Sequence, residues 1–167
     1  MNLRWRLSHA RGYLGLGMLA EAQAELDAID PSDANRADVQ NVRVALLHEQ
    51  QDWPRLLSLA RELVARQPEE PGWWVSLAFA TRRVESLEHA HTVLLEAVKH
   101  HPDQAIIHFN LGCYAAQTGA LEEALRRVRL AIKLSEDFRE IARRDPDLEP
   151  LRAADPSFPG VARSGAR

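Results

Sequence analysis

A period of 34 residues runs along the sequence and constrains its fold more strongly than any other feature. Four positions at this spacing each follow a turn and open a predicted helix: Leu19, Trp53, Leu87 and Leu121. Two further sets of mainly small or apolar residues keep the same step: Ala22, Leu56, Ala90 and Ala124, and Leu26, Ala60, Leu94 and Val128. A period of this length is typical of helix pairs that bury their apolar faces by stacking on neighbouring copies. The sequence therefore predicts an all-α protein built from repeated helix pairs.

The clearest copy lies at residues 108–134, where two amphipathic helices are joined by a turn at Thr118-Gly119. In the first helix Gly112 follows Leu111, and a residue without a side chain lets a second helix approach closely. Gly119 is expected to end this helix, because glycine tolerates a left-handed backbone. The second helix carries one apolar stripe beside a charged face, and the stripe consists of Leu121, Ala124, Leu125, Val128, Ala131 and Ile132.

We divide the chain into four copies, at residues 3–33, 37–68, 71–102 and 105–134. In the third copy, Trp74 stands at the position of His108 in the fourth. The second copy departs from the pattern, because Gln40 and Arg43-Val44 stand where an aromatic residue and a Leu-Gly pair are expected.

This order of aromatic, Leu-Gly, small, Ala, large apolar and Pro positions resembles the tetratricopeptide repeat. The resemblance covers residues 3–134. It implies a right-handed α-solenoid of antiparallel helix pairs, in which the first helix of each pair lines a concave groove. In this family the groove contacts an extended peptide or a partner helix. The matching positions in this sequence include Arg11, Asn41, His48, Val75, Phe79, Arg82, Phe109 and Cys113.

Residues 136–153 do not follow the repeat and are predicted to cap it. The segment EDFREIARR begins with acids and ends with arginines, as a helix dipole favours, and Phe138 and Ile141 can cover the last copy. Stacked repeats need a terminal cap with a polar outer face. We therefore expect a single domain over residues 1–154, followed by a disordered tail at 155–167 that is rich in Pro, Gly and Ser.

The composition indicates a globular protein, with 46% hydrophobic and 27% charged residues. A net charge of -3, with the basic clusters placed beside acids, gives no reason to expect a nucleic-acid partner. No apolar run approaches the ~18 residues that a transmembrane helix needs, so no membrane contact is expected. The abundance of arginine over lysine favours a bacterial origin.

The N-terminus is the one place where a targeting segment has to be weighed. Arg4, Arg6 and Arg11 precede the stretch GYLGLGMLA, an order that a weak signal sequence would also show. Three glycines make a poor signal core, and the first repeat uses the same residues. We therefore expect a cytoplasmic protein.

The residues that could act as catalysts or ligands form no pattern that predicts an enzyme, a metal site or a cofactor site. His89 and His91 are two apart on a helix and face different sides, while His100, His101 and His108 flank a Pro turn without a carboxylate or thiolate at ligand spacing. Cys113 is the one cysteine, so no intrachain disulfide can form, and no third group is placed to orient a Cys-His pair. We expect Cys113 to act as a small apolar residue. We expect the histidines to be hydrogen-bonded or solvated.

The leading hypothesis is a non-catalytic protein-protein interaction module that binds a peptide segment or partner helix in its groove. The groove would have an apolar floor toward its C-terminal half and hydrogen-bond donors from Arg11, Asn41, His48 and Arg82. The alternative for Phe79 is packing against neighbouring repeats or the cap, and the same holds for Phe109.

Two other functions remain open. One is a self-assembling structural protein, in which Leu3, Trp5 and Leu7 of the first helix dock on a second copy. The other is a secretion-type chaperone of similar size and repeat type.

Overall fold

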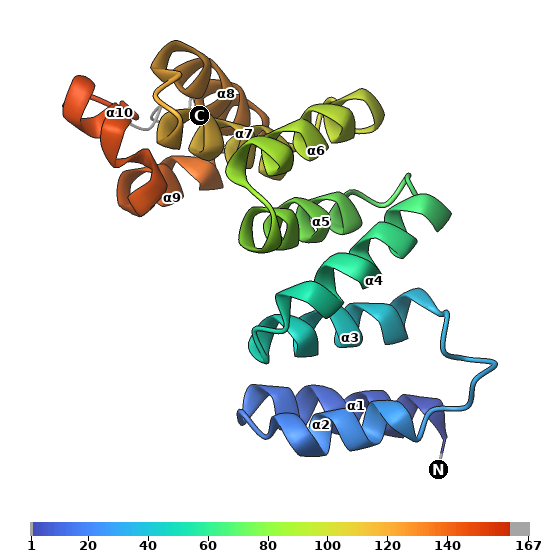
Figure 1. Cartoon of the computed structure of the whole chain (residues 1–167). Coiled ribbons are helices and arrows are strands. Elements are labelled where there is room, and N and C mark those ends of the chain that lie inside the picture. The colour runs from blue at the N-terminus through green and yellow to red at the C-terminus, as the bar shows by residue number, and fades with distance from the viewer. Residues whose placement is uncertain (1, 161–167) are drawn as a thin grey trace, which may run out of the picture. The chain divides into compact units, whose positions relative to one another are not determined.

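The computed structural model describes residues 2–160, which fold into helices without a strand. The chain forms two compact units that meet in sequence between Leu63 and Val64. Figure 1 shows the helices of each unit in chain order.

The first unit contains α1 (Leu3–Gly15), α2 (Leu19–Asp27), α3 (Ala37–Glu49) and the greater part of α4 (Trp53–Arg66). Asn2 caps α1, because its side-chain oxygen accepts a hydrogen bond from the Arg4 backbone N–H at 2.7 Å. A cluster of apolar side chains from α1, α2, α3 and the connection between α2 and α3 forms the core: Leu7, Ala10, Ala22, Leu26, Ile29, Val39, Val42 and Leu46.

The second unit contains two helix pairs and a C-terminal segment. The pairs are α5 (Pro71–Val84) with α6 (Leu87–His100), and α7 (Ala105–Gln117) with α8 (Leu121–Leu134). The C-terminal segment consists of α9 (Asp137–Arg144), the short 3₁₀ helix η1 (Pro146–Leu148) and α10 (Glu149–Ala154). The core includes Trp74, Leu94, Ile107, Leu111, Tyr114, Val128, Leu148 and Leu151.

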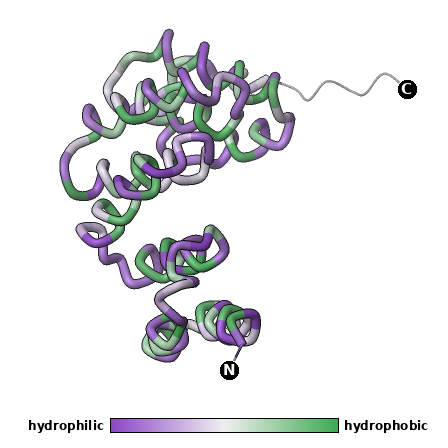
Figure 2. The backbone as a smooth tube through the Cα atoms, turned by 90° about the vertical axis from the view of Figure 1, so that its right-hand side faces the viewer, coloured by the Kyte–Doolittle hydropathy of each residue, from purple (hydrophilic) through white to green (hydrophobic). Residues whose placement is uncertain are grey.

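The apolar stripe predicted for α8 faces this core. Ala124, Val128 and Ala131 are fully buried, whereas Arg126 and Lys133 on the opposite side are exposed. Figure 2 shows the same alternation of hydrophobic and hydrophilic residues along many turns of the helices. Helix amphipathicity therefore decides which face of each pair is buried.

The tight turn between α7 and α8 uses a left-handed residue. Gly119 has φ 81°, and the next backbone N–H, from Ala120, donates to Ala115 O at 2.9 Å. This six-residue closure satisfies a carbonyl that the end of α7 leaves open. Gln51, at the matching position of the second copy, takes the same turn with φ 55°, although a side chain makes that backbone less favourable.

One side-chain hydrogen bond recurs at the same position of three copies. It reaches a carbonyl six residues upstream, in the connection before the first helix. The three bonds join Trp74 Nε1 to Pro68 O (2.8 Å), His108 Nε2 to Pro102 O (2.6 Å) and Gln40 Nε2 to Ala34 O (2.7 Å). An indole, an imidazole and an amide thus tie the start of the helix to the chain that precedes it.

The C-terminal segment covers α7 and α8, as Leu148 and Leu151 lie in the core of the second unit and Phe138 packs against it. Ile141, which the sequence also assigned to covering the last copy, is exposed instead. Residues 155–160, expected to begin a disordered tail, form a turn with Phe158 buried. Arg139 holds this turn by donating to Pro159 O at 2.9 Å. The remainder of the expected tail, 161–167, lies outside the described residues.

Within the described part of the chain, every helix is too short or too polar to cross a membrane.

We expect Gly112→Ala to lower the free energy of unfolding by about 1–3 kcal/mol, because the new methyl group overpacks the contact between α7 and α8. A Cβ at Gly112 would lie 2.5 Å from Val128 Cγ2 and 3.2 Å from the Val128 backbone nitrogen. Urea denaturation followed by circular dichroism measures the change. Gly12→Ala is the matched control, because a Cβ there meets nothing within 4 Å. This substitution should raise the free energy of unfolding by about 0.5–1 kcal/mol, since alanine favours a helix more than glycine does. Equal stability of the two variants would contradict the close approach.

Candidate protein-binding site

Three of the predicted groove residues belong to the first unit and are exposed. Arg11 lies on α1, and Asn41 and His48 lie on α3. The His48 ring meets the Trp53 ring edge-on, with centroids 5.5 Å apart and an interplanar angle of 81°. Exposed polar residues therefore lie on the first helices of this unit, and Trp53 at the start of α4 contacts one of them.

A hollow of about 310 Å³ adjoins Arg11. Its lining combines Leu3 and Leu7 with the pair of Arg36 and Asp38, whose Nε and Oδ1 atoms are 3.1 Å apart. This hydrogen-bonded pair lowers the pKa of Asp38, so the carboxylate stays ionised near neutral pH. The hollow offers both apolar and charged contacts to a partner.

Val75 and Phe79, on α5 of the second unit, are half-buried. The guanidinium carbon of Arg83 lies 5.0 Å from the Phe79 ring centroid. This distance is within the range of a cation–π contact. One face of the Phe79 ring therefore already contacts an arginine of the same helix.

Phe109 and Cys113, on α7, are each only 3% exposed, because the C-terminal segment packs over this part of the helix. The Phe109 ring lies against Phe138 of α9, with centroids 4.9 Å apart. Cys113 Sγ lies 3.9 Å from Asp145 Oδ2, just after α9 ends. Phe109 thus packs under the cap, which is the second of the two roles expected for it.

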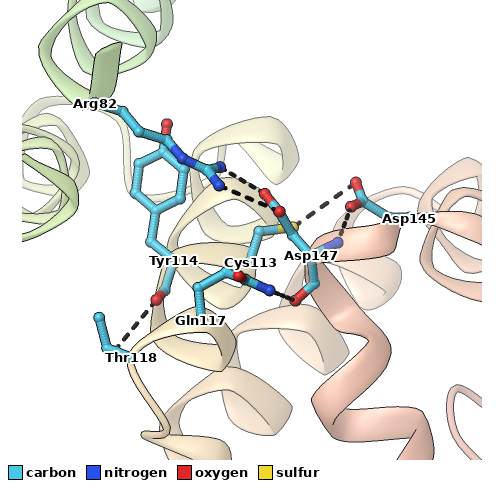
Figure 3. A network of polar contacts seen from close by, with 7 residues as sticks. All are labelled: Arg82, Cys113, Tyr114, Gln117, Thr118, Asp145 and Asp147. Atoms are coloured by element: carbon cyan, nitrogen blue, oxygen red, sulfur yellow. Dashed lines mark hydrogen bonds and ion pairs between the residues drawn. The ribbon is translucent and has the colours of Figure 1, made fainter. Parts of the chain in front are cut away.

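Arg82 forms a bidentate ion pair with Asp147 of η1 (Figure 3). Arg82 Nη1 donates to Asp147 Oδ2 at 2.6 Å, and Nη2 donates to Oδ1 at 3.2 Å. The hydrogen-bonded carboxylate raises the pKa of Arg82. The guanidinium also lies over the Tyr114 ring, 5.2 Å from its centroid. These contacts fix Arg82 against residues far away in the sequence.

Two further polar contacts complete this network, one attaching η1 to α7 and one within the C-terminal segment (Figure 3). Gln117 Nε2 donates to the Asp147 carbonyl at 2.8 Å. The Asp147 N–H in turn donates to Asp145 Oδ1 at 2.9 Å, so Asp145 caps the short helix. The backbone of the segment is therefore bound as well as its side chains.

Neither titratable group at the centre of the network is prepared for nucleophilic chemistry. Burial, helped by the Asp145 and Asp147 carboxylates, raises the pKa of the Cys113 thiol far above its ordinary value. Burial also raises the pKa of Tyr114 to about 12. Because the thiolate is the reactive form of cysteine, Cys113 acts here as a small buried side chain.

The histidines that flank the Pro turn bind main-chain and side-chain groups. His101 Nε2 lies 2.8 Å from Pro68 O. His108 accepts at Nδ1 from Arg127 Nη1, 3.1 Å away, which leaves Nε2 to donate to Pro102 O. This arrangement requires the neutral tautomer of His108 that carries its proton on Nε2. Among the described residues, no three His, Cys, Asp or Glu side chains gather as a metal site would need.

The sequence interpretation missed Gln117 and Asp147. Gln117 follows Phe109 and Cys113 at successive steps of four residues, so helical spacing alone places it on the same face of α7. Asp147 had no such signal, because its partner Arg82 is 65 residues away.

No protein-family model and no curated protein matches the sequence, whereas solved structures match its fold. A thermophilic TPR protein of Thermus thermophilus, TTC0263, is 20% identical, with a TM-score of 0.71 over 90% of this chain and 81% of that one. The MamA RS-1 ArsTM double mutant is 18% identical, with a TM-score of 0.65 over 79% and 74%. MamA AMB-1 is 19% identical, with a TM-score of 0.60 over 92% and 86%. The predicted all-α tetratricopeptide-repeat fold is confirmed.

We expect native Cys113 to react with a thiol reagent only when the C-terminal segment opens. Asp147→Ala removes the ion pair with Arg82, both members of which are partly exposed, so opening should become about fivefold more frequent. The rate of modification by Ellman's reagent measures this. Asp103→Ala, at an exposed turn residue of the same unit, is the control and should leave the rate unchanged. Rapid labelling of the wild-type protein would show that the segment does not protect Cys113.

Proposed function

We propose that the protein is a non-catalytic interaction module that binds a peptide segment or a partner helix on the face formed by the first helices of its pairs. One observation carries this proposal: in the second unit, the first helices α5 and α7 already hold a segment of the same chain. A surface that holds its own helical segment has the chemistry needed to hold another.

The contacts to this segment are of the three kinds used in peptide recognition. Phe138 supplies an aromatic anchor against Phe109, Asp147 supplies a charge for Arg82, and Gln117 binds the main chain of the segment. A few such aromatic and arginine contacts commonly carry most of the affinity of an interface. Phe109, Cys113 and Arg82 therefore support the proposal through an internal ligand.

The first helices of the first unit carry the exposed residues Arg11, Asn41 and His48. Arginine and asparagine both offer N–H groups, and the hollow beside Arg11 adds apolar contacts from Leu3 and Leu7. This chemistry favours a partner segment with carboxylate or carbonyl oxygens beside an apolar side chain. We place the external partner on these residues of the first unit. Val75 and Phe79, on α5 of the second unit, stay predicted contacts of that unit.

A non-catalytic role is supported by the state of the best potential nucleophile, Cys113, which is buried and has a raised pKa. A cytoplasmic location, like a role as a secretion-type chaperone, stays a prediction.

Self-assembly is a second candidate function, and one observation favours it. Trp5 of α1 is 61% exposed, an unusual state for so large an apolar side chain. The other two residues expected to dock on a second copy are less available, because Leu7 is buried in the first unit and Leu3 is half-buried. Any such contact would therefore depend on Trp5.

Affinity capture from an extract of the native cell, followed by titration of the captured protein, tests the proposed face. We expect Arg11→Glu with His48→Glu to weaken binding at least about tenfold, because both changes place a carboxylate against acceptor groups of the partner. The control is Arg129→Glu with His89→Glu, which makes the same chemical changes at exposed residues of the second helices α8 and α6. Equal loss in both variants, or none in the first, would overturn the proposed face.

A further inference from the structure

A cavity of about 380 Å³ lies in the first unit, and its lining includes none of the residues proposed to bind the partner. It is formed by α2, the connection to α3, α3 itself and the first part of α4. Its lining residues are Gln23, Leu26, Ala34, Asn35, Gln40, Arg43, Leu46, Leu47, Arg55, Ser58, Leu59 and Glu62. Cavities of this size are large enough for a small organic molecule.

Two of these residues depart from the repeat at positions that belong to the core in the third and fourth copies. Gln40 stands 34 residues before Trp74, and Arg43 stands 34 residues before Leu77. Trp74 and Leu77 are buried, and so are their counterparts in the fourth copy, His108 and Leu111. The second copy therefore has an amide and a guanidinium where the third and fourth copies have side chains that pack or are fully hydrogen-bonded. The first copy also has polar residues there, Arg6 and His9, and both are only partly buried.

Each of these two polar side chains has one buried atom without a hydrogen-bond partner. Gln40, only 5% exposed, uses Nε2 to bind Ala34 O at 2.7 Å, and its Oε1 atom is unpaired. Arg43 uses Nη2 to bind Leu26 O at 3.4 Å, and its Nε atom is unpaired. No other buried side-chain nitrogen or oxygen in the described residues lacks a partner.

Unpaired buried polar atoms are unfavourable, at about 1–3 kcal/mol each, so their coincidence at one cavity needs a cause. In the fourth copy, by contrast, both ring nitrogens of His108 are paired. A ligand that supplies the missing partners is one such cause. Such a ligand must bring one acceptor for Arg43 Nε–H and one donor for Gln40 Oε1.

These two requirements identify the chemical class. Gln40 and Arg43 are three residues apart on α3, which places them on one face of the helix about one turn apart. An amide group carries a C=O acceptor and an N–H donor side by side, and so can reach both. A carboxylate would satisfy Arg43 but would set its negative charge against the Gln40 oxygen. Leu46 and Leu59 supply apolar wall for the rest of the molecule.

We infer that this cavity binds a small organic molecule with an amide group on an apolar body. The amide oxygen accepts from Arg43 Nε–H, and the amide N–H donates to Gln40 Oε1. Both protein atoms are buried, so the two flexible side chains must rotate to bring them to the ligand. This site is independent of the partner-binding face.

Benzamide and benzoate form a matched pair of probes, because they share one ring and differ in the group that would meet Gln40. We expect benzamide to shift the amide NMR signals of residues 40–47 and 55–62 of the ¹⁵N-labelled full-length chain, and benzoate to bind at least tenfold more weakly. Arg43→Leu introduces the leucine of the third and fourth copies. It should weaken benzamide binding about tenfold, the value of one hydrogen bond to a charged group. Gln40→Met should have a similar effect, and Arg4→Leu on α1 is the control.

Thermal melting of the same variants separates binding from structure. Arg43→Leu should melt at or above the wild-type temperature, because it removes an unpaired buried atom, and benzamide should raise the melting temperature of the wild type alone. Three results would overturn the inference: no benzamide shift in the wild type, binding of benzoate as tight as that of benzamide, or unchanged benzamide affinity in both Arg43→Leu and Gln40→Met.

Discussion

The close packing of α7 on α8 is the contact on which the second unit depends. Gly112 makes it possible, because any Cβ at that position would clash with Val128. The pair then presents Phe109 and Cys113 on one side and its apolar stripe on the other, and the C-terminal segment packs across both helices. Neither helix of a pair can bury its apolar face alone. The close packing of α7 on α8 therefore stabilises both the core and the surface on which the C-terminal segment packs.

The repeated pattern was sufficient to predict the all-α fold and its helix pairs. Side-chain size and hydropathy recur at fixed steps there, so local chemistry determines which face is buried. The candidate site was less predictable. Phe109 and Cys113 occupy groove positions in the repeat, yet a segment after the last repeat covers them. That contact depends on Asp147 meeting Arg82 across 65 residues, and no periodic signal records such a long-range pairing.

Positions that depart from the repeat are as informative as positions that follow it. Gln40 and Arg43 were visible in the sequence as poor matches, but a poor match alone does not distinguish a degraded copy from a specialised one. The structure adds the distinguishing observation, which is that both residues line one cavity and each leaves a buried atom unpaired. Local inconsistency of this kind is concentrated at functional positions in proteins whose other features agree with the fold. The first unit therefore combines a repeat scaffold with a polar interior that stacking does not require.

The hydrogen bond from Trp74, His108 or Gln40 to the carbonyl six residues upstream has a consequence for how such repeats are compared. Residue-type similarity would place an indole, an imidazole and an amide in unrelated classes. Described by its donor geometry, the position is the same in all three copies: a nitrogen on the first turn of a helix directed at the preceding loop. Alignments that score donor placement at this position, rather than side-chain shape, would recognise the second copy as readily as the other two.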